Sequence, residues 1–379
     1  MNLLLFCQFT IRNMSIRIQN RFNRLRKRLK MRGEIFMKTK ILALLMVIAA
    51  LISLTACSEK SNNNITDNPS AESDVGSTDE ANNTVKDEQK AFKVGFVCPE
   101  ATNEGWQVTA AAIEDTAKEL NIEISKLYLD PSDYEGSFAL AVDTFIQQKV
   151  DAIIYGGADE SYAATVHKAQ EEGIKCVEID NPTNAGNLWN ITVDSYAAAA
   201  VAGEWMAKEL DAGVVLMING DMARTNAQQR HDGFVETITN LRSDIEIHEI
   251  YANWDSTTAL AGVEDAITQY GNRIVGVFSA WDGGALAAVS ALEVAGLSDN
   301  VIVCGFDGTP TSMTYIREGK LQAEVGQPLY ELGKVGMQTV NTVLTGGEAE
   351  EKTVVGCSIV TAENVEEFIE SAGLERFMN

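Results

Sequence analysis

The sequence is poor in the residues and motifs from which many catalytic and metal sites are built. Its three histidines (His167, His231 and His248) share no spacing typical of metal ligands. It also contains no Gly-x-Ser-x-Gly nucleophile elbow, no phosphate-binding Walker loop and no His-Glu-x-x-His zinc motif. Paired acids in a cleft can hydrolyse glycosides, but without these motifs the sequence indicates a protein that is not an enzyme and needs no cofactor or metal.

Basic residues become scarce once the first 56 residues are set aside. The whole chain has 30 basic and 54 acidic residues, and residues 1–56 hold 11 of the basic ones and 1 acidic one. The remainder therefore has 19 basic and 53 acidic residues, a net charge of −34. Nucleic-acid binding requires clustered lysine and arginine. The charge balance therefore excludes DNA as a partner.

Long hydrophobic runs are also missing, except for one near the amino terminus. Residues 41–52 are all apolar and follow Lys38 and Lys40. This run is too short to span a bilayer comfortably and is typical of a signal-peptide core. The following Leu54-Thr-Ala-Cys57 resembles a bacterial lipoprotein cleavage box. We therefore expect residues 37–56 to be a lipoprotein signal peptide, with Cys57 lipid-anchored at the extracytoplasmic face of the cell membrane; the alternative is an uncleaved anchor.

The segments on either side of this signal have unusual compositions. Residues 1–36 are rich in arginine, and we interpret them as an upstream extension from a mis-assigned start; the alternative is a basic arm that contacts nucleic acid or a membrane surface. Residues 57–90 contain no aromatic residue and few aliphatic ones. They cannot bury enough apolar surface to fold, so the sequence predicts a disordered tether.

Two stretches of the remaining chain repeat one pattern of strand, helix and strand. The second strand of each unit is followed by an aspartate, Asp180 in the first and Asp307 in the second. Ligands of open parallel sheets bind outside the carboxyl ends of the strands. The repeat therefore predicts two similar α/β lobes that present acids to a shared cleft.

Apolar runs and Ala-rich helical stretches alternate throughout this region, which is the pattern of a doubly wound α/β fold with parallel sheets. The predicted strands are 92–97, 122–129, 152–155, 174–179, 214–218, 245–251, 274–278 and 301–306. The predicted helices are 106–120, 137–148, 159–172, 197–210, 223–239, 257–270, 284–295 and 329–344. We expect the four cysteines of this body to be free and mostly buried: Cys98, Cys176, Cys304 and Cys357.

Three tryptophans fall just past predicted strands, where they would border the cleft. They are Trp106, Trp254 and Trp281, and the last of them is followed directly by Asp282. Sugars bind with their C–H faces against aromatic rings and their hydroxyls on polar side chains. This combination indicates a binder of polyhydroxylated small molecules.

The residues from Ala91 to Val360 resemble the ribose- and galactose-type (type I) periplasmic binding proteins, the solute-binding components of ABC sugar importers. The most specific motif is Gly305-Phe-Asp-Gly-Thr-Pro310, and the Asn103-Glu-Gly-Trp106 loop is also typical of the family. The resemblance implies a three-crossing hinge near Asp194, Gln327–Pro328 and Val355–Cys357. Lobe one would then comprise residues 91–194 and 328–355, and lobe two residues 195–327 and 356–379.

The resemblance also implies ligand-binding residues, an ABC permease as the partner and a monomeric state. The ligand-binding set is Asn103, Trp106, Asp180, Asn181, Arg230, Trp254, Trp281, Asp282, Asp307 and Gln327. Asn181 stands where the family usually has arginine, and Trp281 where it usually has asparagine. We therefore expect a sugar, polyol or derivative other than ribose, while a non-carbohydrate ligand, or a sensor that partners a membrane receptor kinase or chemoreceptor, remains open.

Overall fold

The computed structural model describes residues 91–378 except 182, 184 and 187. The predicted extension, signal peptide, lipid-anchored Cys57 and tether lie outside the described residues. Within the described part, no helix combines the length and apolarity needed to cross a membrane.

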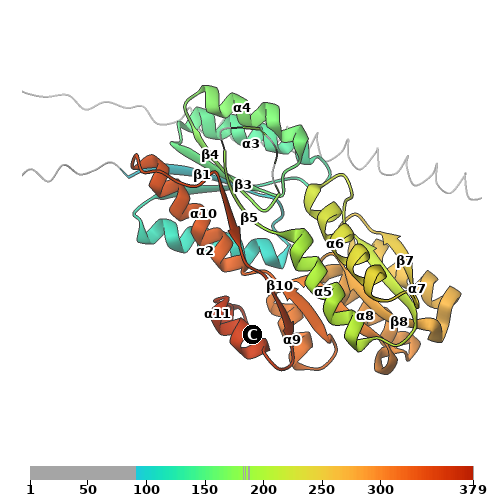
Figure 1. Ribbon diagram of the computed structural model, residues 1–379. Helices are drawn as coiled ribbons and strands as arrows, with labels where there is room; N and C mark the ends of the chain where they lie inside the picture. The colour runs from blue at the N-terminus through green and yellow to red at the C-terminus, as the bar shows by residue number, and fades with distance from the viewer. Residues whose placement is uncertain (1–90, 182, 184, 187, 379) are drawn as a thin grey trace, which may run out of the picture. The chain divides into compact units, whose positions relative to one another are not determined.

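Two six-stranded sheets organise the described chain (Figure 1). The first has the order β11-β5-β4-β3-β1-β2, and all of its pairings are parallel. Its strands are β1 (Lys93–Cys98), β2 (Glu123–Tyr128), β3 (Ala152–Gly156), β4 (Lys175–Ile179), β5 (Trp189–Val193) and β11 (Lys352–Val355).

The second sheet has the order β12-β10-β9-β8-β6-β7 and is parallel except for its edge strand β12. Its strands are β6 (Gly213–Asn219), β7 (Ile245–Tyr251), β8 (Ile274–Ser279), β9 (Ile302–Asp307), β10 (Ala323–Gly326) and β12 (Ser358–Thr361). The prediction of two α/β lobes with mostly parallel sheets is confirmed.

Helices cover both faces of each sheet (Figure 1). The first sheet lies between the pair α2 (Glu104–Glu119) and α10 (Leu329–Leu344) and the pair α3 (Tyr134–Gln148) and α4 (Ala163–Glu171). The second lies between α5 (Ser195–Glu209) with α6 (Thr225–Leu241) and α7 (Ser256–Tyr270) with α8 (Asp282–Ala295). Shorter helices are α9 (Pro310–Arg317), α11 (Val365–Ser371) and the 3₁₀ turns Glu160–Tyr162, Gly271–Arg273, Ser298–Asn300 and Glu375–Phe377.

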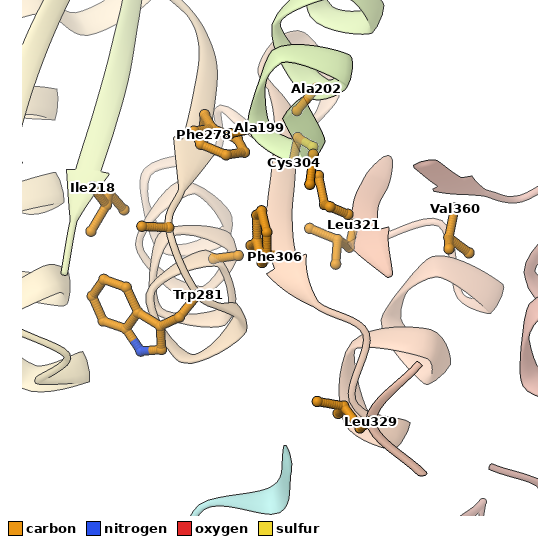
Figure 2. Close-up of a cluster of buried hydrophobic side chains, with 14 of the residues drawn as sticks. Ala199, Ala202, Ile218, Phe278, Trp281, Cys304, Phe306, Leu321, Leu329 and Val360 are labelled. Atoms are coloured by element: carbon orange, nitrogen blue, oxygen red, sulfur yellow. The ribbon is translucent and has the colours of Figure 1, made fainter. Parts of the chain in front are cut away.

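The continuous apolar character of the strands follows from this double coverage, because both faces of each sheet are buried. In β6, all six residues after Gly213 are buried. Figure 2 shows part of the resulting core in the second lobe, where Ala199 and Ala202 of α5 lie beside Cys304 of β9. The four described cysteines are free; three are buried and Cys357 is partly exposed.

The chain passes between the two sheets at Asp194, at Gln327–Pro328 and at Gly356–Cys357, within the residues that the structure describes. Asp194 also caps α5, because its Oδ1 accepts a hydrogen bond from the Ala197 backbone N–H at 3.0 Å. Gln327 lines the cavity described below. Each lobe is therefore assembled from separate segments of the chain.

Candidate ligand-binding cleft

The two aspartates of the sequence repeat occupy equivalent places in the two lobes. Asp180 directly follows β4, and Asp307 is the last residue of β9. Both have a positive φ, 79° for Asp180 and 120° for Asp307, which is uncommon for a residue other than glycine. Such backbone conformations concentrate at functional sites. Here they accompany two carboxylates that line the same cavity.

This cavity has a volume of about 700 Å³ and is lined by residues of both lobes. Nine of the ten predicted ligand-binding residues line it: Asn103, Trp106, Asp180, Arg230, Trp254, Trp281, Asp282, Asp307 and Gln327. The lining also includes Glu104 and Asn226, which the sequence prediction missed. Pockets of roughly 300–1,000 Å³ are typical for small-molecule ligands.

Arg230, on α6, connects the acids of the two lobes. Its Nη1 donates to Asp307 Oδ1 at 3.0 Å and to the Ala280 carbonyl at 2.7 Å. Its Nη2 lies 3.9 Å from Asp180 Oδ1. The guanidinium also lies 3.9 Å from the centre of the Phe306 ring, and the residue is only 3% exposed. Arg230 is therefore rigidly held by packing and by charged hydrogen bonds.

Two of the acids that the second lobe contributes to the cavity, Asp282 and Asp307, have perturbed pKa values. Burial raises the pKa of Asp307 to about 6, and the nearby Arg230 opposes this shift. Gln327 supports the same carboxylate, because its Nε2 donates to Asp307 Oδ1 at 2.6 Å. Burial and the Asp307 charge raise the pKa of Asp282 to about 8, while its Oδ2 accepts a hydrogen bond from Thr309. The cleft thus presents acceptors and donors that are already oriented.

Aromatic rings complete the lining. Trp254 and Trp281 meet edge to face, with ring centres 5.5 Å apart. Two glycines make room for the rings of Trp106 and Trp254: a Cβ at Gly156 would lie 2.1 Å from the ring of Trp106, and one at Gly220 would lie 2.2 Å from that of Trp254. The rings can therefore reach the cavity only because these two positions have no side chain.

The tenth predicted residue, Asn181, does not line the cavity. It is buried, its Nδ2 donates to the Ala158 carbonyl, and its Oδ1 accepts from the Asn226 backbone N–H at 3.0 Å. Asn226 in turn donates to Asp180 Oδ2 at 3.0 Å. Asn181 therefore joins the first lobe to the start of α6 instead of lining the cavity.

Other contacts also join the lobes around the cavity. The backbone N–H and the hydroxyl of Thr311, in the second lobe, each donate to a carboxylate oxygen of Glu104 in the first lobe at 3.1 Å. Arg224, the residue directly before α6, donates to the carbonyl of Gly157. These hydrogen bonds hold the lobes together around the cavity.

Glu178, in β4, is a buried carboxyl that supports the loop after Asp180. The residue is 1% exposed, and its Oε2 accepts a hydrogen bond from the Thr183 backbone N–H at 3.1 Å. Burial raises the pKa of Glu178 from 4.5 to about 7, although the hydrogen bonds from Thr183 and Asn190 oppose the shift.

We expect Glu178→Gln to flatten the pH dependence of stability. The Glu178 carboxyl binds its proton more tightly in the folded state than in the unfolded chain. The free energy of unfolding should therefore fall as the pH rises from 4.5 to about 7. The variant should be more stable than the parent at pH 8 by up to roughly 3 kcal/mol. Urea denaturation at pH 5 and pH 8 measures the difference, with the exposed Glu246→Gln as the control. If the free energy of unfolding of Glu178→Gln changed with pH as much as that of the parent, the raised pKa of Glu178 would be contradicted.

The fold and the cleft define a two-lobed α/β binding protein. The periplasmic binding protein domain family matches residues 94–348. The chain belongs to this family, which confirms the family resemblance of the sequence. In the part of the chain that the structure describes, no group of three or more histidine, cysteine, aspartate or glutamate residues could hold a metal ion.

Curated relatives and solved structures agree with this assignment. The ribose import binding protein of Escherichia coli (strain K12) is 28% identical over 197 residues, which cover 52% of this chain and 66% of that protein. The D-apiose import binding protein of Paraburkholderia graminis is 28% identical over 282 residues, which cover 73% of this chain and 89% of that protein. A periplasmic solute-binding protein of Actinobacillus succinogenes 130z, solved with bound D-allose, superposes with a TM-score of 0.69 at 24% identity, covering 73% of this chain and 99% of the other.

Proposed function

We propose that this protein is a lipid-anchored solute-binding protein that captures a small sugar or sugar-like molecule between its lobes. In this proposal it delivers the ligand to the permease of an ABC importer at the extracytoplasmic face of the membrane. Similar proteins support the substrate class, since two relatives are named as import binding proteins for ribose and D-apiose. The Cys57 lipid anchor follows from the sequence of the leader.

One observation carries the proposal: two strand-end carboxylates, a buried arginine and three tryptophan rings line a single cavity between two lobes. Asp180 and Asp307 would accept hydrogen bonds from neighbouring hydroxyls, while Arg230 would donate to hydroxyl or ring oxygens. Trp106, Trp254 and Trp281 would pack against C–H faces. The cleft offers both donors and acceptors beside apolar rings, which is what a neutral polyhydroxylated ligand requires.

Ligand binding also fits the contacts between the lobes. A ligand favours closure only as far as it binds the closed form better than the open one. Asp180 belongs to the first lobe, whereas Arg230 and Asp307 belong to the second. A sugar that contacts all three would bind the closed form best, and we propose that this form is the one that the permease recognises.

A thermal-shift screen of the purified chain tests the proposal. The probes are D-ribose, D-apiose, D-allose and myo-inositol at millimolar concentration, together with common pentoses, hexoses and polyols. A ligand at a thousand times its dissociation constant stabilises the native state by about 4 kcal/mol, so a micromolar ligand should raise the melting temperature clearly.

The control for this screen is Asp307→Asn, which keeps the shape of the side chain and removes its charge. The shift should shrink strongly in this variant, because a charged hydrogen bond contributes roughly 1.5–3 kcal/mol and its loss removes a large part of the ligand's stabilising effect. A shift of equal size in the parent and in the variant would place binding elsewhere. The absence of any shift with every sugar and polyol would contradict carbohydrate binding.

A further inference from the structure

The ligand cavity extends beyond the proposed sugar site to a second set of side chains, which we call the outer group. The outer group consists of Glu100, Tyr134, Asp221 and Arg224, and all four line the same cavity as Asp180 and Arg230. At about 700 Å³ the cavity is in the upper half of the range for small-molecule pockets. A single monosaccharide is much smaller than the drug-sized ligands that such pockets bury, so the cavity has room for a larger molecule.

Direct contacts connect three members of the outer group: Tyr134, Asp221 and Arg224. The Arg224 guanidinium lies 5.5 Å from the centre of the Tyr134 ring, and its Nε lies 3.4 Å from Asp221 Oδ2. The same side chain donates to the carbonyl of Gly157 across the lobe boundary. The Arg224 side chain is 12% exposed, so it is held in place beside the cavity.

Two polar atoms of the outer group have no hydrogen-bond partner among the described residues. The Tyr134 hydroxyl and Glu100 Oε2 make no hydrogen bond with any described residue, whereas Glu100 Oε1 accepts from Thr102 at 2.9 Å. A half-buried tyrosine ring, a free hydroxyl and a free carboxylate oxygen repeat the chemistry of the proposed sugar site.

The charges of the outer group decide which chemical class fits. An anionic substituent would face Glu100 and Asp221, and a cationic one would face Arg224. A neutral group with several hydroxyls can donate to the acids and accept from the arginine without either conflict. The ring of Tyr134 can at the same time pack against an apolar C–H face.

We propose that the outer group is a second subsite that takes a second sugar ring, so that the physiological ligand is a disaccharide rather than a free monosaccharide. This inference rests on the proposed function, because the first ring must occupy the site formed by Asp180, Arg230 and Asp307. Arg224, which lines the cavity together with Asp180 and has its guanidinium 5.5 Å from the centre of the Tyr134 ring, would lie at the junction of the two subsites.

The experiment compares each disaccharide with its own monosaccharides. Isothermal titration of the purified full chain uses cellobiose, maltose, lactose and melibiose, and D-glucose and D-galactose. We expect at least one disaccharide to bind about tenfold or more tightly than either of its component sugars, because it adds an aromatic contact and hydrogen bonds. Tyr134→Ala should remove this advantage and leave the affinity for the monosaccharide within about twofold.

Three further variants separate the possible outcomes. Glu100→Gln has nearly the same shape as the parent and should weaken only the disaccharide, which guards against a folding defect in Tyr134→Ala. Tyr128→Ala, at an exposed tyrosine of the same lobe, should change neither affinity. Trp254→Ala should weaken both ligands, because Trp254 belongs to the proposed site for the first ring.

Two results would overturn the inference. Monosaccharides that bind at least as well as every disaccharide, with no effect of Tyr134→Ala or Glu100→Gln, would show that the outer group is not a subsite while leaving the proposed function intact. The absence of binding by every sugar, single or double, would overturn the proposed function as well.

Discussion

Arg230→Ala should abolish measurable sugar binding and strongly destabilise the second lobe. The guanidinium is the cation that contacts both strand-end carboxylates, and its loss leaves Asp307 buried without its 3.0 Å ion pair. Removing one partner of a buried pair costs about 3–5 kcal/mol of folding stability. The loss of two charged hydrogen bonds to a ligand should lower the affinity more than about a hundredfold. Urea denaturation measures the first effect and isothermal titration the second.

Two comparisons show whether the effect is specific to this arginine. Arg230→Lys retains the charge but loses the planar donor fork, so it should recover part of the stability and little of the affinity. Arg273→Ala removes an exposed arginine that pairs with Glu246 at 2.6 Å, and should cost less than about 1 kcal/mol. Sugar affinity in Arg230→Ala equal to that of the parent would refute the assigned role.

Gly233→Ala should strongly destabilise the second lobe. Gly233 lies on α6 against α5, and a Cβ there would come within 2.2 Å of the backbone carbonyl oxygen of Tyr196. Because this neighbour is backbone, relief requires the two helices to separate. Overpacking costs about 1–3 kcal/mol or more, only partly offset by the better helix propensity of alanine. A loss of about 2 kcal/mol should lower Tm by roughly 4–8 °C.

The first lobe offers an independent test of the same packing argument. A Cβ at Gly333, on α10, would lie 2.3 Å from the backbone oxygen of Thr109 on α2. Gly333→Ala should therefore destabilise the protein by a similar amount. At Gly356 a Cβ would meet no atom within 4 Å, so Gly356→Ala serves as the control. Equal melting temperatures for Gly233→Ala and Gly356→Ala would show that the helices accommodate the methyl group.

Local patterns were enough to predict most of the fold. The predicted segments 245–251 and 329–344 coincide with β7 and α10 residue for residue. Four strands were not predicted. One is β5, which has five residues, and the other three have four residues each: β10 (Ala323–Gly326), β11 (Lys352–Val355) and β12 (Ser358–Thr361). Segments of this length carry little periodicity, and they become strands because distant parts of the chain provide an edge for pairing.

The cleft was predictable where its residues follow strands, and not where it depends on how the two lobes meet. Asp180 and Asp307 stand at strand ends, so the position of each follows from local sequence. The contacts of Asn226 and Glu104 arise between lobes, and no local pattern marks them. Asn181 follows Asp180, whose φ of 79° no local pattern predicts, and its side chain bonds to Ala158 and Asn226 instead of lining the cavity.

The passage of the chain between the two sheets has a consequence for how the protein is made. The edge strand β11 of the first sheet begins at Lys352, after the second lobe has contributed all of its strands except β12. Chains emerge from the ribosome amino terminus first, and domains usually fold as units in that order. Here the sheet of the first lobe is incomplete until β11 is synthesised, and the sheet of the second lobe until β12 is synthesised. A stop codon shortly before Lys352 would therefore deprive both sheets of an edge strand at once, and a nascent chain should stay dependent on chaperones until these two strands appear.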